Sequence, residues 1–423
     1  MKKLLFLGVS TDTQDALAYA KSKGIYTIVT DYNSPEKSIE KQYADDFWCI
    51  DLVDLDILER KCRDEQINGI YAGNNEFCLD QTKELARRLN LPFYASEEGW
   101  KAARDKVLFK QYCISAGLHV PKRYSLEKDF QPKVLKEIMY PVMIKPVDSC
   151  AAQGVSVCKN EEELRIGYKN ALDRSNSGKV IVEDYITGQE ITACYYISNG
   201  IAQLIYMNKG FPTVINGKKY FFGVTTNRHE EYEDYKKKTS DAVQRLFSKL
   251  KCKNGCVFLQ MIKSEDQYYF FEMGYRMDGL GGWIIAKEIY GIDLIAKLVE
   301  LALGENSSEK SIEDIKDNKK TGLIYLLGAK TGRVSKIKGI EEVKKMEGVR
   351  VVLERCKLGE MQINEDSMYQ AVYYITIIST DSLTAAKKLQ KINESLYMYD
   401  ENNNDMLIRF TDYKRLAADW SMN

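Results

Sequence analysis

The chain has 423 residues, of which 44% are hydrophobic and 29% are charged, so it should fold into roughly two to four globular domains. Lys and Arg together number 61, and Asp and Glu also number 61, which excludes a global field that would attract nucleic acid or an anionic membrane. No stretch approaches the roughly 18 to 20 apolar residues that a membrane helix needs, so we expect a soluble cytoplasmic protein.

Cysteine and histidine usage limits the chemistry further. The chain has ten cysteines without a spaced framework and only two histidines, His119 and His229. This composition favours reduced cytosolic thiols and argues against a cysteine–histidine zinc site. It also argues against a histidine base, although carboxylates or a metal ion can take that role.

Residues 1–98 alternate apolar runs with amphipathic stretches. We predict strands and helices in turn at Lys3–Val9, Asp12–Lys23, Tyr26–Thr30, Asp54–Gln66, Gly69–Ala72 and Asp80–Leu89. This alternation predicts a parallel, doubly wound sheet. The turn after the first strand has no G-x-G-x-x-G pattern, so no dinucleotide is indicated there. Asp31, at the end of the second strand, either grips a ribose or caps a turn.

Two lysines follow in contexts that suit phosphate binding. Lys106 lies in the run Arg104–Lys110, and Lys145 lies near the end of the predicted strand Tyr140–Pro146, before the small-residue loop 148–155. A lysine at a strand end can reach phosphate oxygens, and a loop of small residues lets backbone N–H groups approach them. Taken alone, each lysine is more simply an exposed surface residue.

A strand with an extended end follows at Val180–Ile186, and Gly188-Gln189-Glu190 comes directly after it. Such an end can pair its backbone with an adenine edge, while a nearby carboxylate accepts from ribose hydroxyls. The alternative is an edge strand with two solvated acids. Farther along, Arg228 or His229 could bind a carboxylate, although exposed loop residues explain them as well.

The most informative segment is a predicted hairpin with strands at Cys256–Leu259 and Tyr268–Phe271. Across it, Gln260 and Glu272 can face one another, so a carboxamide oxygen and a carboxylate could reach one hard cation, with Arg276 a few residues on. This arrangement suits a magnesium nucleotide. The alternative is a surface hairpin with ordinary charges.

The tail begins with a charged stretch, 306–320, that we interpret as a solvated helix or connector. After it we predict strands at Gly322–Leu327, Val349–Leu353 and Ala371–Ile378, and an amphipathic helix at Leu383–Leu396. The tail should therefore be a small α+β unit.

In this order, the segments resemble the ATP-grasp superfamily, whose members include carbamoyl phosphate synthetase, biotin carboxylase and the L-amino acid ligases. The resemblance covers nearly the whole chain and implies an α/β and α+β architecture. It implies a doubly wound, Rossmann-like pre-ATP-grasp domain over residues 1–98 and an ATP-grasp domain over 99–305, with a nucleotide-binding subdomain at about 120–190. A small carboxy-terminal α+β domain would occupy 306–423.

The resemblance also implies roles for particular residues. Lys106 and Lys145 match the phosphate-contacting lysines, and Gln260 and Glu272 match the two magnesium positions. Arg276 matches the arginine that holds the acyl phosphate or the carboxylate substrate. The adenine hinge of the family is matched by Glu183, Asp184, Tyr185 and Ile186, and its ribose-binding acid by Glu190. Its phosphate loop is matched at Ser149, and its substrate loop at Gly279 and Gly281. Arg276, Lys145 and Glu272 would be the catalytic residues.

The chain departs from the family pattern at three positions. The phosphate loop reads Ala151-Ala152-Gln153-Gly154, where relatives carry several glycines and a basic residue. Fewer glycines restrict the backbone and one phosphate contact is lost, so loop closure and turnover are in question. The first metal position is Gln260 rather than an acid, and Gly274 stands where relatives have asparagine. A neutral oxygen ligand still suits magnesium, which tolerates several waters.

The resemblance implies an ATP- and Mg²⁺-dependent carboxylate–amine ligase, with Mn²⁺ as a substitute metal, that forms an amide through an acyl phosphate and releases ADP and phosphate. Its partners would be a small carboxylate, such as an amino, hydroxy or sugar acid, and an amine. By analogy with relatives it could be a homodimer. Two alternatives stay open: a carboxylate or carbamate kinase-like activity, and a nucleotide-binding regulatory protein without turnover.

Overall fold

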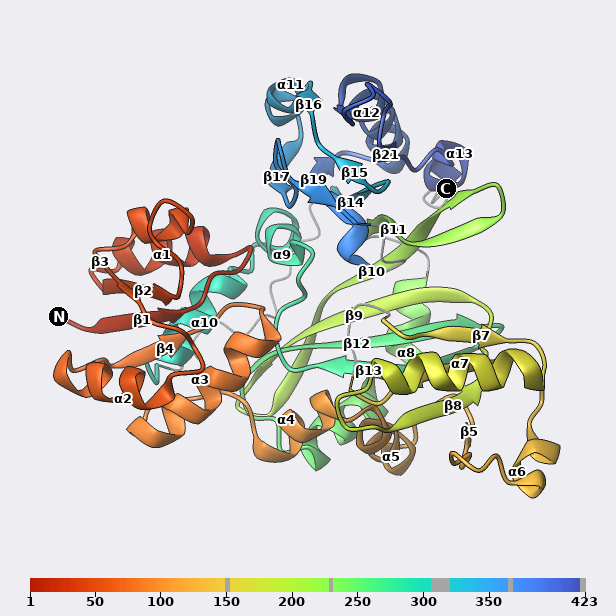
Figure 1. Cartoon of the computed structure of the whole chain (residues 1–423). Coiled ribbons are helices and arrows are strands. Elements are labelled where there is room, and N and C mark those ends of the chain that lie inside the picture. The colour runs from red at the N-terminus through yellow and green to blue at the C-terminus, as the bar shows by residue number, and fades with distance from the viewer. Residues whose placement is uncertain (149–152, 228–230, 306–319, 364–367, 419–423) are drawn as a thin grey trace.

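The computed structural model describes residues 1–148, 153–227, 231–305, 320–363 and 368–418. Three larger sheets organise these residues, a parallel four-stranded sheet, an antiparallel four-stranded sheet and a nine-stranded sheet, and two further sheets have two strands each. In Figure 1 the first lies at the left, the second at the lower right, and the third runs from the centre to the C-terminal region at the top. Among the described helices, none is long and apolar enough to cross a bilayer.

The N-terminal sheet has the strand order β3-β2-β1-β4, and each neighbouring pair is parallel. This confirms the parallel sheet predicted from the alternating pattern. Its elements are β1 (Lys3–Leu7), α1 (Thr13–Ser22), β2 (Tyr26–Asp31), η1 (Ile39–Tyr43), β3 (Asp46–Cys49), α2 (Leu55–Asp64), β4 (Gly69–Tyr71) and α3 (Glu76–Leu89). Helix α3 begins earlier than predicted because the side chain of Asn75 accepts from the amide of Cys78 and caps the helix there.

Asp31 is turned into the protein at the end of β2. Lys41 Nζ lies 2.8 Å from its Oδ1, and the Ser38 hydroxyl donates to its Oδ2 at 2.7 Å. The amide of Asn33 also donates to Asp31, at 2.8 Å. Asp31 therefore organises the turn after β2, which was the second of its two interpretations.

The antiparallel sheet has the order β5-β8-β6-β7, with α7 packed on one face. Leu164 and Ala171 of this helix are fully buried against Ile144 and Val182 of the strands. The elements of this region are α4 (Glu97–Arg104), α5 (Lys106–Ala116), β5 (Arg123–Tyr124), α6 (Pro132–Glu137), β6 (Val142–Pro146), β7 (Ser156–Cys158), α7 (Glu161–Asp173) and β8 (Val180–Asp184).

The central strands of the nine-stranded sheet are antiparallel and include the predicted hairpin, which is confirmed as β12 paired with β13. The elements here are β9 (Gln189–Ser198), β10 (Ile201–Ile215), β11 (Lys218–Thr226), α8 (Glu231–Lys249), β12 (Gly255–Ser264), β13 (Gln267–Gly274), α9 (Gly282–Tyr290) and α10 (Leu294–Ala302). Leu259 and Met261 are buried with Phe247 of α8 and Phe109 of α5, so these helices share a core with one face of the sheet.

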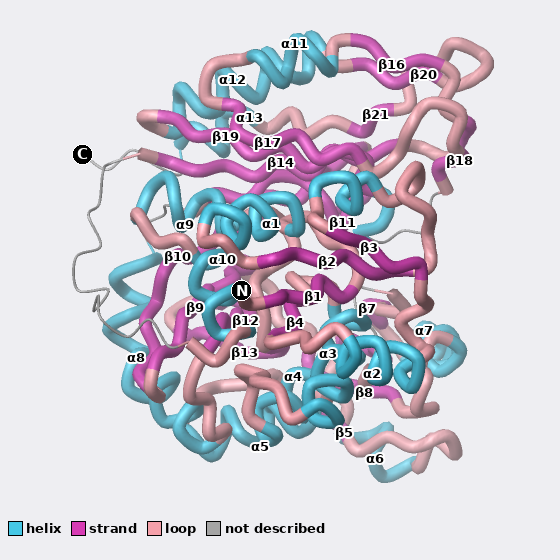
Figure 2. The backbone as a smooth tube through the Cα atoms, turned by 90° about the vertical axis from the view of Figure 1, so that its left-hand side faces the viewer, coloured by secondary structure: helices cyan, strands magenta, loops and turns pink. Residues whose placement is uncertain are grey.

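The same sheet continues into the C-terminal region, in the order β13-β12-β9-β10-β11-β14-β19-β17, with β21 paired to β14. Figure 2 shows α11, α12 and α13 above the strands β14, β17 and β19. The elements are β14 (Thr321–Ala329), β15 (Gly332–Arg333), β16 (Lys336–Lys338), α11 (Ile340–Lys345), β17 (Val349–Glu354), β18 (Met361–Gln362), η3 (Met368–Gln370), β19 (Ala371–Ser379), α12 (Ser382–Ser395), β20 (Tyr397–Tyr399), β21 (Leu407–Ile408) and α13 (Tyr413–Ala418).

The mixed α/β and α+β fold class is thus confirmed, whereas the limits 1–98, 99–305 and 306–423 stay predictions. The three predicted C-terminal strands and the helix correspond to β14, β17, β19 and α12. Most of the predicted connector lies outside the described residues, at 306–319.

Candidate active site

Gln260 and Glu272 lie directly opposite one another in the β12–β13 ladder, as the sequence predicted. On the other side of β12, Thr192 of β9 pairs with Gln260, so three polar residues form a row across the sheet. Leu259 and Met261 are fully buried in the core with α5 and α8. Because side chains alternate along a strand, the polar row points away from that core.

Lys106 brings a positive charge to this row from helix α5. It is the first residue of the helix, which Asp105 caps by accepting from the amides of Val107 and Leu108 at 2.8 and 3.0 Å. Lys106 Nζ lies 3.6 Å from Glu272 Oε2. Beside this pair is a cavity of about 70 Å³, lined by Glu76, Ala102, Ala103, Arg104, Lys106, Phe109, Asp148, Glu272 and Met273.

Lys145 is paired with a buried carboxylate. Its Nζ lies 2.5 Å from Glu183 Oε1, and Lys110 of α5 donates to the other oxygen, Oε2. Burial would raise the pKa of Glu183, but Lys145 and Lys110 outweigh burial and lower it. Burial, together with the charge of Lys145, lowers the pKa of Lys110 to about 8, against the opposing effect of Glu183. All three side chains are almost inaccessible, and the triad carries one net positive charge at neutral pH.

Lys110 was not among the site residues predicted from the sequence. It lies four residues after Lys106 in α5, and side chains at that spacing share one face of a helix. The four-residue spacing from Lys106 is therefore the sequence signal that could have identified Lys110 as a site residue.

The predicted adenine hinge leaves β8 beside the same triad. The amide of Asp184 donates to the carbonyl oxygen of Lys122 at 2.9 Å, and the amide of Tyr185 donates to that of Pro141 at 3.3 Å. These two N–H groups are therefore already used within the protein. The Asp184 carboxylate accepts from the Tyr124 hydroxyl at 2.7 Å, which fixes the end of β8.

Glu190, the predicted ribose acid, is open to solvent near the start of β9. The surrounding protein raises the pKa of its carboxyl, an effect that Lys219 opposes and Glu272 reinforces. Gly188 lies so close to β12 that a Cβ at this position would be 2.0 Å from the carbonyl oxygen of Lys263.

Arg276 lies just beyond β13 and is held from three sides. Its Nε and Nη2 donate to Glu76 Oε1 at 3.1 and 2.8 Å, and its Nη1 donates to the carbonyl oxygen of Met277 at 2.9 Å. The guanidinium also lies 5.0 Å from the centre of the Phe258 ring. The arginine is therefore fixed in place by residues of α3 and β12.

The two predicted substrate-loop glycines differ in their surroundings. A Cβ at Gly279 would meet no atom within 4 Å, whereas one at Gly281 would lie 3.1 Å from Thr376 Oγ1 of β19. Gly279 thus borders open space and Gly281 contacts the C-terminal region. Ser149, Arg228 and His229 lie outside the described residues.

The donor set at the hairpin fits magnesium, because carboxamide and carboxylate oxygens are its preferred protein ligands. Among the described residues, no group of three or more His, Cys, Asp or Glu side chains could hold a metal ion. Gln260 and Glu272 could therefore supply only part of a coordination shell, with substrate oxygens and water completing it.

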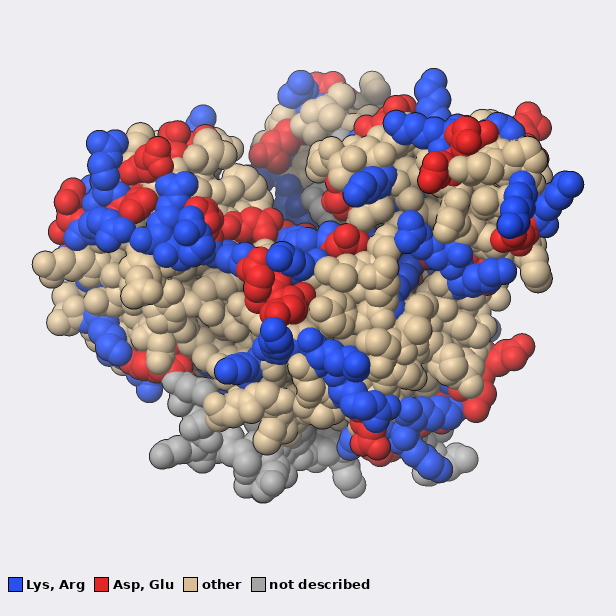
Figure 3. All heavy atoms as spheres, turned by 90° about the horizontal axis from the view of Figure 1, so that it is seen from below, with Lys and Arg blue, Asp and Glu red and all other residues tan. Residues whose placement is uncertain are grey.

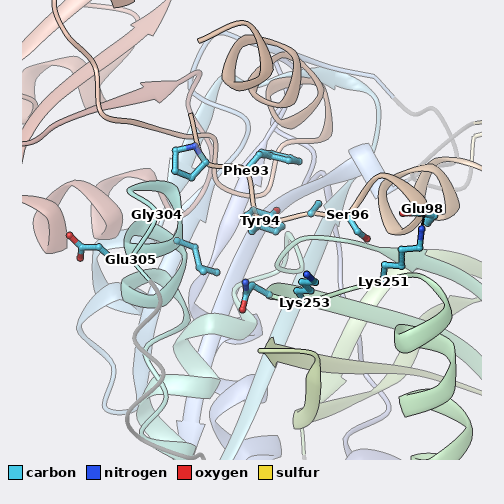
Figure 4. A pocket seen from close by; sticks show the side chains of 12 residues that line it. Phe93, Tyr94, Ser96, Glu98, Lys251, Lys253, Gly304 and Glu305 are labelled. Atoms are coloured by element: carbon cyan, nitrogen blue, oxygen red, sulfur yellow. Dashed lines mark hydrogen bonds and ion pairs between the residues drawn. The ribbon is translucent and has the colours of Figure 1, made fainter. Parts of the chain in front are cut away.

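The face seen from below carries basic and acidic side chains interspersed, without a broad field of one sign (Figure 3). A larger cavity, of about 450 Å³, is lined by none of the predicted site residues. Figure 4 shows the rings of Phe93 and Tyr94 at its centre and Lys251 pointing toward Glu98. The smaller cavity, in contrast, is lined by Lys106 and Glu272 of the predicted site, with Glu76 and Arg104 beside them.

Comparison with known proteins identifies the central region. A sequence model of the ATP-grasp domain matches residues 103–279. The carbamoyl phosphate synthase large chain of Methanosarcina mazei is 26% identical over 178 residues, which is 40% of this chain and 16% of that protein. The D-alanine–D-alanine ligase of Bacillus velezensis is 33% identical over 116 residues, which is 25% of this chain and 32% of that protein. The chain therefore spans a third or less of the length of these relatives.

The fold extends this similarity beyond the central region. The crystal structure of an L-amino acid ligase from Bacillus licheniformis superposes with a TM-score of 0.77 at 18% identity, over 95% of this chain and 99% of that one. This likeness concerns the fold and includes the N- and C-terminal regions. Residues 103–279 thus match the ATP-grasp domain, and the chain as a whole shares the fold of this ligase structure.

Proposed function

We propose that the protein is an ATP- and Mg²⁺-dependent carboxylate–amine ligase that forms an amide bond and releases ADP and phosphate. The observation that carries the proposal is the register of the β12–β13 hairpin, which sets Gln260 opposite Glu272. Lys106 lies 3.6 Å from Glu272, and Arg276 follows four residues later. Oxygen ligands, a phosphate-binding lysine and a carboxylate-binding arginine are thus supplied within one short stretch of structure.

In the proposed reaction, a carboxylate oxygen of the substrate attacks the γ-phosphorus of ATP, the bond to the β-phosphate oxygen breaks, and ADP leaves. The amine nitrogen then attacks the acyl carbon, phosphate leaves, and the nitrogen loses a proton to give the amide. Magnesium, when bound by Gln260 and Glu272, would supply charge neutralisation for the phosphates. Mn²⁺ would serve the same ligands.

The chain's own residues would bind and orient the reactants. Lys106 would leave Glu272 for the phosphate oxygens, and Lys145 would contact them from the end of β6. Arg276 would hold the oxygens of the acyl phosphate and of the tetrahedral intermediate.

The nucleotide base and ribose would lie against the end of β8. Ile186 and the carbonyl oxygen of Asp184 are proposed for the adenine edge, since the amides of Asp184 and Tyr185 are already bonded. Glu190 is proposed for the ribose hydroxyls. Ser149 is proposed as a phosphate contact on the basis of the sequence pattern alone.

We also infer that the protein works in the cytoplasm on small molecules and forms a homodimer by analogy with relatives. The nine described cysteines are all unbridged, which suits a reducing compartment.

The test measures ADP and phosphate release from ATP and magnesium across a matrix of carboxylic acids and amines. Release that requires both an acid and an amine is expected for the wild type, and Glu272→Ala and Lys145→Ala should abolish it. The matched controls Glu162→Ala and Lys169→Ala change exposed residues of α7 and should leave release unchanged.

Other outcomes would point elsewhere. ADP formation that needs the acid but not the amine would replace ligation with a kinase-like activity. Magnesium-dependent ATP binding without ADP formation for any pair would favour a regulatory nucleotide-binding protein.

A further inference from the structure

The larger cavity, of about 450 Å³, is built from segments that are far apart in the sequence. Its lining residues come from 92–98 between α3 and α4, from 251–254 between α8 and β12, and from 301–305 at the end of α10. Its volume falls within the range of about 300–1,000 Å³ that small-molecule sites occupy. None of the residues proposed for ATP, magnesium or the carboxylate substrate lines it. A ligand bound here would therefore be separate from the proposed active site.

Two aromatic residues, Phe93 and Tyr94, contribute to the wall of this cavity (Figure 4). Their ring centres are 5.1 Å apart and the ring planes are inclined by 22°. Both residues are half-buried, so each still has surface that a ligand can cover. A flat aromatic ligand is favoured at such a wall, because aromatic rings gain from offset or edge-to-face packing beyond the burial of their apolar surface.

The fold holds both rings in place before any ligand binds. The Tyr94 hydroxyl donates to the carbonyl oxygen of Tyr275 at 3.1 Å. The Phe93 ring packs edge-on against Trp100, with ring centres 5.3 Å apart. A Cβ at Gly255 would lie 2.4 Å from Tyr94 Cδ2, so the glycine lets the Tyr94 ring lie against the start of β12. Because the rings are already ordered, a ligand loses little free energy in fixing them.

The charged residues around the cavity leave one positive charge without a counterion. Lys251 forms an ion pair with Glu98, and Glu305 forms one with Lys2. Lys253 is exposed on the cavity wall and has no ion-pair partner among the residues that the structure describes. A ligand with a single negative charge would balance this ammonium group.

Asn254 adds a neutral donor next to Lys253 in the sequence, and both residues line the cavity. Its Oδ1 accepts from the amide of Asn199 at 3.1 Å, which fixes the orientation of the carboxamide. Its Nδ2 has no acceptor within the described part of the chain. One ammonium group and one amide N–H group suit the two oxygens of a carboxylate.

We propose that this cavity binds a planar aromatic monocarboxylate with one ring or two fused rings. The ring packs against Phe93 and Tyr94, and the carboxylate accepts from Lys253 Nζ and Asn254 Nδ2. The inference does not depend on the proposed ligase function, since it requires neither ATP nor magnesium.

The experiment is calorimetry of the full chain without nucleotide, with benzoate and indole-3-carboxylate as probes. We expect at least one probe to bind with a Kd of about 0.1–1 mM. Its uncharged amide, benzamide or indole-3-carboxamide, should bind about 5-fold more weakly or worse, because it lacks the charge that Lys253 balances. Cyclohexanecarboxylate should also bind more weakly than the better probe, because it has the charge but no aromatic ring.

Lys253→Gln should weaken the binding of the better probe about 5-fold, and the exposed position of Lys253 makes the substitution compatible with folding. The matched control is Lys249→Gln, which removes the same charge from an exposed residue at the end of α8 that does not line the cavity. Its affinity for the probe should equal that of the wild type.

Arg276→Gln separates this cavity from the proposed active site, where a carboxylate could also bind, and it should leave the probe affinity unchanged. Four results would overturn the inference. They are no binding of either probe, equal binding of the acid and its amide, equal affinities of Lys253→Gln and Lys249→Gln, or binding that is lost in Arg276→Gln but kept in Lys253→Gln.

Discussion

Glu183 sets the charge on the phosphate side of the proposed site, because it is paired with two lysines at once. A buried carboxylate with one lysine would be neutral as a pair and would hold that lysine in place. With Lys110 as a second counterion, Lys145 can turn toward a phosphate without leaving Glu183 unpaired in the interior. Lys110 is thus a positioning residue for Lys145.

The pKa of Lys110, lowered to about 8, predicts how nucleotide affinity depends on pH. Below this pKa Lys110 is charged and the triad carries one positive charge. Above it Lys110 is neutral, and the triad attracts phosphate less. Affinity of the wild type for magnesium-ATP should therefore fall several-fold as the pH rises from about 7 to about 9.

Lys110→Met tests this expectation, because its side chain never carries a charge and Glu183 keeps Lys145 as a partner. The variant should bind ATP more weakly than the wild type at pH 7 and should converge with it at high pH, as measured by calorimetry at constant ionic strength. Parallel pH profiles for the two proteins would contradict the role assigned to Lys110.

At this scale the sequence predicted the residues that carry a local signature. Lys145 stands near the end of an apolar strand, and Gln260 and Glu272 belong to a predicted hairpin, so the adjacent sequence identifies them as candidates. No local sequence pattern identifies Glu76, because its partner Arg276 is 200 residues away and only folding brings the two residues together. The pairing of Glu183 with Lys110 and Lys145 was missed for a similar reason, since these lysines reach it from two elements in different parts of the chain.

Among the elements, the β12–β13 hairpin shows what a glycine at position 274 accommodates. Phe258 lies directly opposite Gly274 in the ladder, and a Cβ at Gly274 would lie 2.2 Å from Phe258 Cε1 and Cζ. The aromatic ring thus covers the glycine. The same ring packs against the guanidinium of Arg276. Gly274 therefore leaves space for an aromatic ring that supports the proposed substrate arginine.

Gly274→Ala should consequently disturb Arg276 as well as the fold. The added methyl group forces Phe258 to move, which should cost about 1–3 kcal/mol of unfolding free energy and reduce ADP release, as measured by denaturant titration and the coupled assay. Gly279→Ala is the control for stability, because a Cβ there meets no atom within 4 Å. An unchanged unfolding free energy for Gly274→Ala would show that Phe258 moves aside without cost.

Hairpins and alternating strands and helices are local patterns, which explains why these elements were predicted with shifts of a few residues at their ends. The short strand β3 has only four residues and was missed. The pairing of strands that are far apart in the sequence could not be predicted either. No local pattern in Lys218–Thr226 indicates that this strand pairs with β14, across a sequence separation that includes α8, the β12–β13 hairpin, α9, α10 and residues 306–319.

For the whole molecule, this pairing joins the central and C-terminal regions into one sheet. Val224, Thr225 and Thr226 of β11 pair with Tyr325, Ile324 and Leu323 of β14. Across the seam, Phe222, Ile285 and Ile289 share a buried cluster with β14 and β19. The C-terminal α+β unit predicted from the sequence therefore shares its main sheet and part of its core with the region that carries the proposed site.

A fragment ending at residue 305 should accordingly fail to fold. Exposing Phe222, Ile285 and Ile289 forfeits about 1.5–3 kcal/mol for each side chain, a sum comparable with the 5–15 kcal/mol that stabilises a typical domain. The fragment would also present β11 as an unpaired edge, which favours aggregation. Circular dichroism and size-exclusion chromatography should show an unfolded or aggregated fragment, and calorimetry of the full chain should not show a separate C-terminal transition. Co-expression of 1–305 with 320–423 should restore a soluble complex, since the seam can form between two chains. A soluble, cooperatively folded 1–305 fragment would instead mean that the central region completes its own core and that the shared sheet is not required for its stability.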